Sequence, residues 1–296
     1  MSGKIHIPAD VKTWIYGKFA ICNESATRNL SRQHAIEEPS LDYALIDSLR
    51  GQQSTYTSPS MWKVTIDANS MAKGRHWQGR WEIADIGVVL RFLDHNQRIA
   101  RTKVALLQSK KLYTREVKET KVSAELPTPA PSPRKFIFDN DSKYNELNPN
   151  KDQYARIEEF ESHSRIPVFY LLYNPVRSPW EISYPALSEV SLPEYDLGCK
   201  ITPASSVRSL LSAQSSARPP SLGDIETAIQ ESDENPGTFK GWRLEEFITG
   251  PFLDCSEGRI FEDQMDLDLF NMIYARSAPI QSAISIDITN PSDWVY

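Results

Sequence analysis

The fold is decided by an alternating stretch, residues 81–92 (WEIADIGVVLRF), which is followed by residues 94–98 (DHNQR) and residues 100–111 (ARTKVALLQSKK). After Asp85, the first arm places an apolar side chain at every second position, which is the period of a β-strand. The short polar segment between the arms predicts a turn, so the two arms form a β-hairpin. Gln108 and Lys110 stand two residues apart near the end of the second arm and therefore project from one face.

The register of this hairpin can be estimated from its turn. If the turn is centred near Asn96, the numbers of opposed residues sum to about 192, which places Asp85 opposite Leu107 and one residue from Gln108. Adjacent strands lie about 4.8 Å apart. We therefore expect Asp85, Gln108 and Lys110 to meet at one end of the sheet.

Elements on both sides of the hairpin complete an α/β pattern. A helix is expected over 41–51, with Ser40 as its N-cap and Gly51 as its end. The apolar run 168–175 lies between prolines, which is typical of a buried strand, often parallel to its neighbour. The other expectations are an element of uncertain type at 9–22, a loop or short helix at 23–36, a polar turn at 74–80, strands at 61–69, 201–203 and 283–288, and helices at 150–163, 205–214, 222–230, 241–252 and 264–276.

This order predicts an α/β sandwich whose core spans residues 1–175. A Pro-rich linker or loop at 124–135 interrupts the core. Residues 176–296 form a more acidic region, either packed on the same core or separate from it.

Composition favours a protein of the cytoplasm. Hydrophobic residues make up 40% of the 296 residues, yet no apolar run approaches the ~18 residues of a membrane span. The N-terminus lacks the apolar stretch of a signal peptide. The 3 cysteines are odd in number and widely spaced, which argues for a reducing compartment, and the 5 histidines have no metal-ligand spacing. No phosphate-binding Gly-rich loop and no Gly-x-Ser-x-Gly elbow is present in the sequence.

Charge is unevenly distributed along the chain. The net charge is −6, but residues 1–140 hold 21 basic and 14 acidic residues, whereas residues 141–296 hold 12 and 25. Nine of the basic residues fall within 91–121. Such a basic stripe is expected of a protein that binds a phosphate backbone. It is equally typical of a solvated hairpin that uses Lys and Arg to protect an edge strand.

An acidic residue on one strand, Asp85, followed on the next by Gln108-Ser109-Lys110, resembles the core of the PD-(D/E)xK nucleases. The pattern is most similar to the Gln-x-Lys variant of Mrr-type restriction endonucleases and related bacterial defence nucleases. The resemblance covers about 38–175. It implies a restriction-endonuclease-like mixed sheet flanked by helices.

The resemblance also implies a chemistry for these residues. Asp85 would bind Mg²⁺ or Mn²⁺, and Gln108 would offer a carbonyl oxygen in place of the usual carboxylate. Lys110 would orient the attacking water and stabilise charge in the transition state. Since Gln108 is neutral, a further carboxylate would be useful as a ligand: Glu38 is the first candidate and Glu37 the next. Glu82 would need a β-bulge to reach the same face.

Three functions remain open on the sequence. The first is a metal-dependent endonuclease that cleaves DNA, or alternatively RNA, within a defence system, with a protein partner or a second copy bound through the C-terminal half. Its expected nucleic-acid contacts are Arg91, Arg101, Lys103 and Lys111. The second is a catalytically inactive nuclease fold that binds nucleic acid or assists assembly, and the third is a scaffold with an acidic working surface. An Asp at a strand end, or Gln-Ser-Lys closing a strand, is often just the polar end of a strand.

Overall fold

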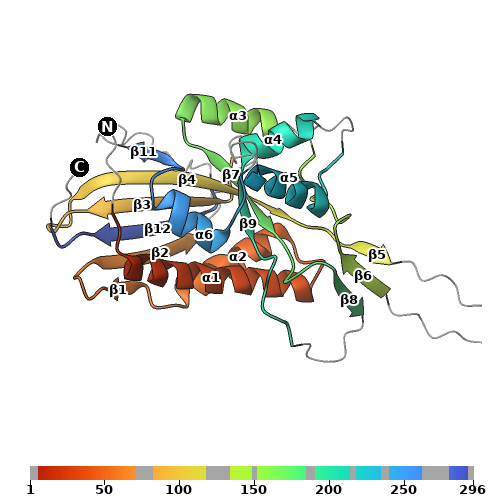
Figure 1. The fold of residues 1–296 in the computed structure, drawn as a ribbon, viewed down its shortest axis with the longest axis horizontal. Helices are drawn as coiled ribbons and strands as arrows, with labels where there is room; N and C mark the ends of the chain where they lie inside the picture. Colours follow the sequence, from red (N-terminus) through yellow and green to blue (C-terminus); the bar gives the residue numbers. More distant parts are fainter. Residues whose placement is uncertain are drawn as a thin grey trace, which may run out of the picture.

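The computed structural model of the chain describes residues 6–70, 83–117, 134–148, 152–184, 191–213, 218–234, 240–261 and 280–292. One mixed sheet organises these residues (Figure 1). Its strand order is β1-β2-β12-β3-β4-β7-β9-β10, with β11 also paired to β4. The strands of this sheet are β1 (Thr55–Thr57), β2 (Lys63–Ser70), β3 (Ile86–Leu93), β4 (Ile99–Lys111), β7 (Val168–Tyr173), β9 (Lys200–Pro203), β10 (Trp242–Arg243), β11 (Arg259–Phe261) and β12 (Ser282–Thr289).

The β3–β4 hairpin lies at the centre of the sheet, as its apolar sequence requires. Ile86 pairs with Leu107, so opposed residue numbers sum to 193, and the expected register is confirmed to within one residue. A register shift between Phe92 and Leu93 accommodates the turn. β7 lies beside β4 in parallel orientation, and all its residues are buried, as the apolar run predicted. Trp81 and Glu82, at the expected start of the hairpin, lie outside the described residues.

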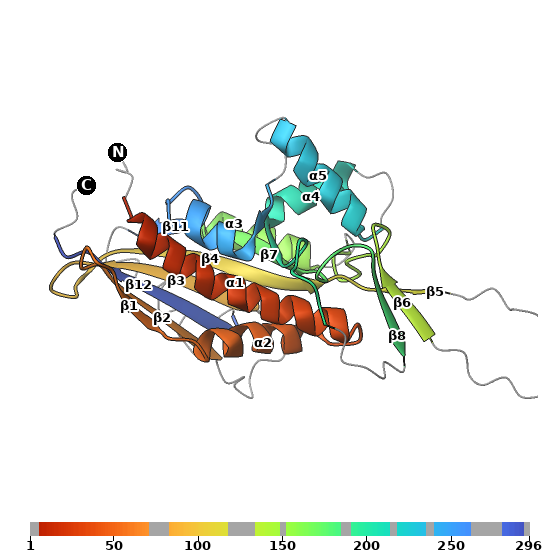
Figure 2. The same cartoon turned by 60° about the horizontal axis from the view of Figure 1, so that its bottom comes forward.

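Helices cover both faces of this sheet (Figures 1 and 2). On one face, α1 and α2 lie along the strands, and α6 packs there through Phe247 against Phe169 of β7, with ring centroids 4.8 Å apart. On the other face α3 contacts β7 through Tyr154 and Tyr170. The helices are α1 (Ala9–Arg32), α2 (Glu38–Arg50), α3 (Gln153–Ser164), α4 (Ala204–Ala213), α5 (Leu222–Glu234), α6 (Leu244–Phe247) and the π-helical turn η1 (Ile248–Phe252).

Residues 9–36, for which the sequence left the type of element open, mostly form one helix of 24 residues, α1. Its buried stripe mixes apolar side chains with Asn23, Thr27 and Ser31, which weakened the helical pattern in the sequence. These polar side chains hydrogen-bond within the fold. For example, Asn23 donates to Glu245 at 2.7 Å. Distant partners therefore permit a polar residue on the buried face of a helix.

The expectation of one regular helix over 241–252 was wrong at its start, and only residues 244–252 are helical. The segment divides into β10, a single turn α6 and the π-helical turn η1. Pro251 lies within η1 and has no N–H to continue a regular ladder.

The second half of the chain contributes directly to the main sheet. β12 lies between β2 and β3, antiparallel to β2 and parallel to β3. The alternation at 283–288 predicted a strand that returns to the sheet, and this is confirmed. β9, β10 and β11 also come from this half. A second, three-stranded sheet stands at the end of the molecule beyond the end of β4 (Figure 1). It consists of β5 (Arg115–Val117), β6 (Arg134–Phe138) and β8 (Trp180–Tyr184). The expected turn at 74–80, most of the Pro-rich segment at 124–135 and the expected helix at 264–276 lie outside the described residues.

Candidate functional site

The polar end of the hairpin brings Asp85 and Gln108 into contact. Asp85 directly precedes β3, and its backbone N–H donates to the carbonyl oxygen of Leu107 at 2.9 Å. This extends the strand pairing by one residue and sets the Asp85 carboxylate beside β4. The Gln108 amide nitrogen donates to Asp85 Oδ2, and the backbone N–H of Ser109 donates to the same oxygen at 2.8 Å.

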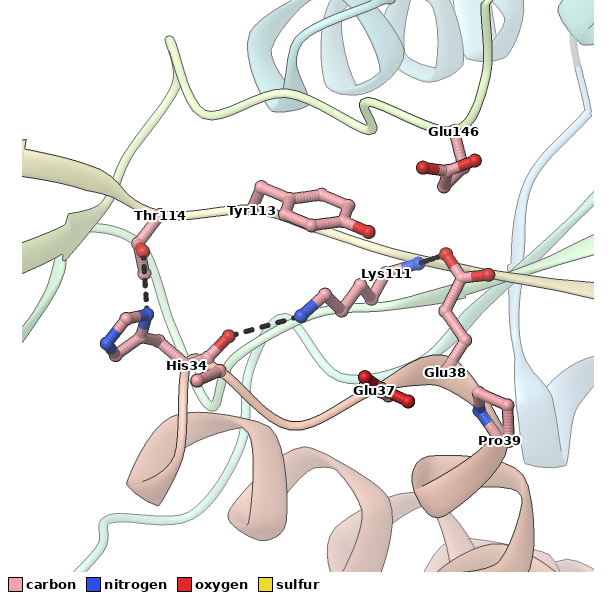
Figure 3. Close-up of a pocket in the computed structure, with 9 residues that line it drawn as sticks. His34, Glu37, Glu38, Pro39, Lys111, Tyr113, Thr114 and Glu146 are labelled. Carbon is pink, nitrogen blue, oxygen red and sulfur yellow. Dashed lines mark hydrogen bonds between the residues drawn. The ribbon is translucent and has the colours of Figure 1, made fainter.

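Glu38 joins the site from the first residue of α2. Its Oε1 accepts a hydrogen bond from the backbone N–H of Lys111 at 2.9 Å, and its Oε2 lies 3.6 Å from Lys110 Nζ. Figure 3 shows Glu38 reaching from the helix start toward β4. Glu38, Asp85, Gln108 and Lys110 therefore all lie at the C-terminal end of β4, in two contacting pairs joined by that strand.

Gln108 carries one of six buried side-chain nitrogen or oxygen atoms that have no hydrogen-bond partner in the described part of the chain. The residue is only 4% exposed, and its Oε1 has no hydrogen-bond partner among the described residues. A buried carbonyl oxygen without a donor costs about 1–3 kcal/mol, so such atoms are rare and call for an explanation. The amide nitrogen donates to Asp85, so this orientation leaves the oxygen as the free atom.

Asp42 is a site residue that the sequence analysis missed. It lies one turn after Glu38 on α2 and is buried, and its Oδ1 accepts hydrogen bonds from Ser109 Oγ and from Tyr173 Oη, the latter at 2.6 Å. Burial raises the pKa of this carboxyl to about 8, and the negative charges of Asp85 and Glu38 add to the rise. The Glu-x-x-x-Asp spacing on one helix face was the available signal. It was hidden among the leucines of the predicted apolar face.

Gln281 is the second residue that was missed. Its side-chain nitrogen donates to Asp85 Oδ1 at 3.1 Å. It comes from the residue before β12, 196 positions along the chain, so no local sequence pattern could have placed it at this site.

The basic residues expected to contact nucleic acid lie mostly inside the protein. Lys103 is fully buried and donates to the carbonyl oxygen of Phe252 at 2.5 Å. Lys111 is buried and donates to the carbonyl oxygens that precede α2, and Arg101 is buried as well. Arg91 forms a two-point ion pair with Asp287 at 2.6 and 2.7 Å. In this conformation these four side chains do not form a surface that a phosphate backbone could follow.

A cavity of about 500 Å³ opens beside Glu38 (Figure 3). Its wall includes the His34 ring, the Tyr113 ring and the carboxylates of Glu37, Glu38 and Glu146. Burial raises the pKa of Tyr113 to about 12, and the three carboxylates contribute to the rise. The cavity is therefore rich in hydrogen-bond acceptors, and Glu38 links it to Lys110.

The oxygen donors available to a cation are few. Within the described ranges, no three His, Cys, Asp or Glu side chains lie close enough together to hold a metal ion. Glu38 lies against Lys110 and Lys111, so the candidate donors that contact each other are Asp85 and the amide of Gln108. These two residues fit a divalent cation in one respect, since Gln108 offers a buried carbonyl oxygen to which no donor in the described part of the chain is hydrogen-bonded.

Comparison with known proteins adds no assignment: no family model, no curated protein and no solved structure matches the chain. Among the helices in the described part of the chain, none is both long and apolar enough to cross a membrane.

Proposed function

We propose that the protein is a metal-dependent nuclease that hydrolyses phosphodiester bonds, with Asp85, Gln108, Lys110 and Glu38 as its site. The observation that carries this proposal is the buried Gln108 amide, whose nitrogen donates to the Asp85 carboxylate and whose oxygen has no partner among the described residues. A purely structural glutamine at this position would be expected to use both ends of its amide. A cation held by Asp85 and Gln108 gives that oxygen a role.

Each residue has a defined task in this proposal. Asp85 and Gln108 would hold Mg²⁺ or Mn²⁺. Gln108 would do so after its amide turns to direct the oxygen toward Asp85. A bound divalent cation supplies an activated water and neutralises charge on the phosphate oxygens. Lys110 donates to the attacking water or to a phosphate oxygen, which stabilises the charge that develops in the transition state. Glu38 holds the Lys110 ammonium in place through their 3.6 Å ion pair.

DNA is the proposed substrate, on the strength of the resemblance to restriction and defence nucleases, and RNA is the alternative. The test incubates supercoiled plasmid and single-stranded oligonucleotides with the wild type in Mg²⁺ or Mn²⁺. Cleavage is expected with wild type and is expected to disappear in Asp85→Ala and Lys110→Ala. Lys240→Ala is a matched control, because that lysine forms an exposed ion pair with Glu257. Cleavage that persists in both site variants would show that the site is wrong.

A second candidate, a nuclease fold that binds nucleic acid without cleaving it, is favoured by one observation. The Asp85 carboxylate already accepts hydrogen bonds from Gln108, Ser109 and Gln281. Donors in this number are what a structural carboxylate would require. Binding that weakens steeply with salt, with no cleavage under any metal condition, would favour this candidate.

A further inference from the structure

The residue that precedes β12 is bound to Asp85 through both its backbone and its side chain. The backbone N–H groups of Gln281 and Ser282 donate to the Asp85 carbonyl oxygen at 3.0 and 2.9 Å. The Gln281 side chain then donates to Asp85 Oδ1 at 3.1 Å. Two adjacent residues thus make three hydrogen bonds to one site residue.

These contacts come from a firmly held part of the fold. β12 pairs along its whole length with β2 on one side and with β3 on the other, from Ser282 opposite Ile86 to Thr289 opposite Leu93. Ile280 is 4% exposed and packs on Gly87, where an added Cβ would lie 2.7 Å from Ile280 Cδ1. The position of the Gln281 backbone is therefore set by the centre of the sheet.

The two carboxylate oxygens of Asp85 accept hydrogen bonds from two different segments of the chain. Oδ2 accepts from Gln108 and Ser109 on β4, whereas Oδ1 accepts from Gln281. A carboxylate held at one oxygen alone can rotate about its Cβ–Cγ bond, and a group held at both oxygens cannot. Gln281 therefore contributes to fixing the orientation of the Asp85 carboxylate.

We propose that Gln281 is a positioning residue that orients Asp85 for cation binding, so that the second half of the chain completes the site. This inference rests on the proposed function, since it assigns Asp85 a cation. Residues that hydrogen-bond to a metal ligand commonly raise metal affinity by about 10–100-fold. Gln281 would do so without touching the cation or the substrate.

The test measures Mn²⁺ affinity by calorimetry on the full chain without nucleic acid, comparing wild type, Gln281→Met and Asp85→Ala. Methionine matches the length of glutamine and removes the donor. We expect about a tenfold or greater loss of Mn²⁺ affinity in Gln281→Met. In cleavage assays this variant should need more metal for the same rate, should regain the rate at high metal concentration, and should keep the KM for DNA. Asp85→Ala should not be rescued.

Two further variants make the outcome decisive. Gln97→Met is the matched control, because its amide donates to Thr289 at the other end of β12. It should leave Mn²⁺ affinity unchanged. Gln281→Asn withdraws the amide by one methylene and carries the test if the methionine variant does not fold. Wild type that binds no Mn²⁺ would overturn the proposed function itself. If wild type binds Mn²⁺ and a folded Gln281 variant binds it with the same affinity, the role of Gln281 alone would be overturned.

Discussion

Replacing Asp42 with asparagine should stabilise the folded protein as the pH rises. The pKa of Asp42 is raised from 3.8 to about 8 by burial and by Asp85 and Glu38. Between these values, the unfolded chain has lost the proton while the folded protein keeps it. The unfolded state therefore binds fewer protons, and the free energy of unfolding falls with rising pH. The asparagine side chain does not titrate, so the variant does not lose this part of the free energy of unfolding as the pH rises.

The size of this effect follows from the pKa difference. Each pKa unit corresponds to about 1.4 kcal/mol, so a shift of about four units gives an upper limit of about 6 kcal/mol above pH 8. Asparagine retains the oxygen that accepts from Ser109 and Tyr173, but it buries an amide nitrogen, at a cost of about 1–3 kcal/mol if unpaired. This cost does not depend on pH. The informative quantity is therefore the slope of the stability difference.

Urea unfolding followed by tryptophan fluorescence provides the assay, at several pH values from 5 to 8.5. The free energy of unfolding of Asp42→Asn minus that of wild type should increase by about 1.4 kcal/mol per pH unit up to about pH 8 and then level off. Asp47→Asn on the same helix controls for loss of a carboxylate at a position that is not in the site. Parallel stability curves for Asp42→Asn and wild type would refute the reasoning, as would a difference that shrinks with rising pH.

Three further predictions follow from the charged groups. Gln108→Glu should lower the melting temperature of the metal-free protein, because it adds a carboxylate beside Asp85. Mn²⁺ should raise the melting temperature of this variant more than that of wild type. An equal rise in both proteins would contradict the metal site. The pKa of Lys103 is lowered from 10.5 to about 8 by burial, so wild type should gain stability relative to Lys103→Met between pH 8 and 10.5 in denaturant titrations; a flat difference would contradict this. A double-mutant cycle on Arg91 and Asp287 should give a coupling energy of about 1 kcal/mol, because the pair is two-point and partly buried; a value near zero would show that it contributes nothing.

Local periodicity accounts for the parts of the fold that could be predicted. The hairpin register follows from a short turn and two alternating arms, and the buried strand β7 follows from an uninterrupted apolar run. α1 could not be predicted in full, because its buried face uses Asn23 and Thr27. Those residues become acceptable in the core only through partners on other elements, such as Glu245.

The same distinction separates the parts of the site. Asp85 and Gln108 lie opposite each other on one hairpin, so counting residues was enough to predict their contact, whereas the printed contact of Lys110 is with Glu38. Glu38 was suggested by the resemblance alone, and Gln281 reaches the site through a sheet order that the sequence does not reveal. Counting charges misplaced Lys103, because a count does not distinguish a solvated ammonium from one that donates to buried carbonyl oxygens.

The charge separation along the chain has a partial explanation inside the fold. Basic residues of the first half pair with acidic residues of the second: Lys12 with Asp254 at 2.5 Å, Arg91 with Asp287 at 2.6 Å and Lys135 with Glu181 at 3.7 Å. The first two pairs form because the segment after η1 and β12 return to elements from the first half of the chain, and the third forms because β8 pairs with β6. A basic first half and an acidic second half therefore do not by themselves require an external partner of opposite charge. The two halves of the chain build one sheet and both contribute to one candidate site.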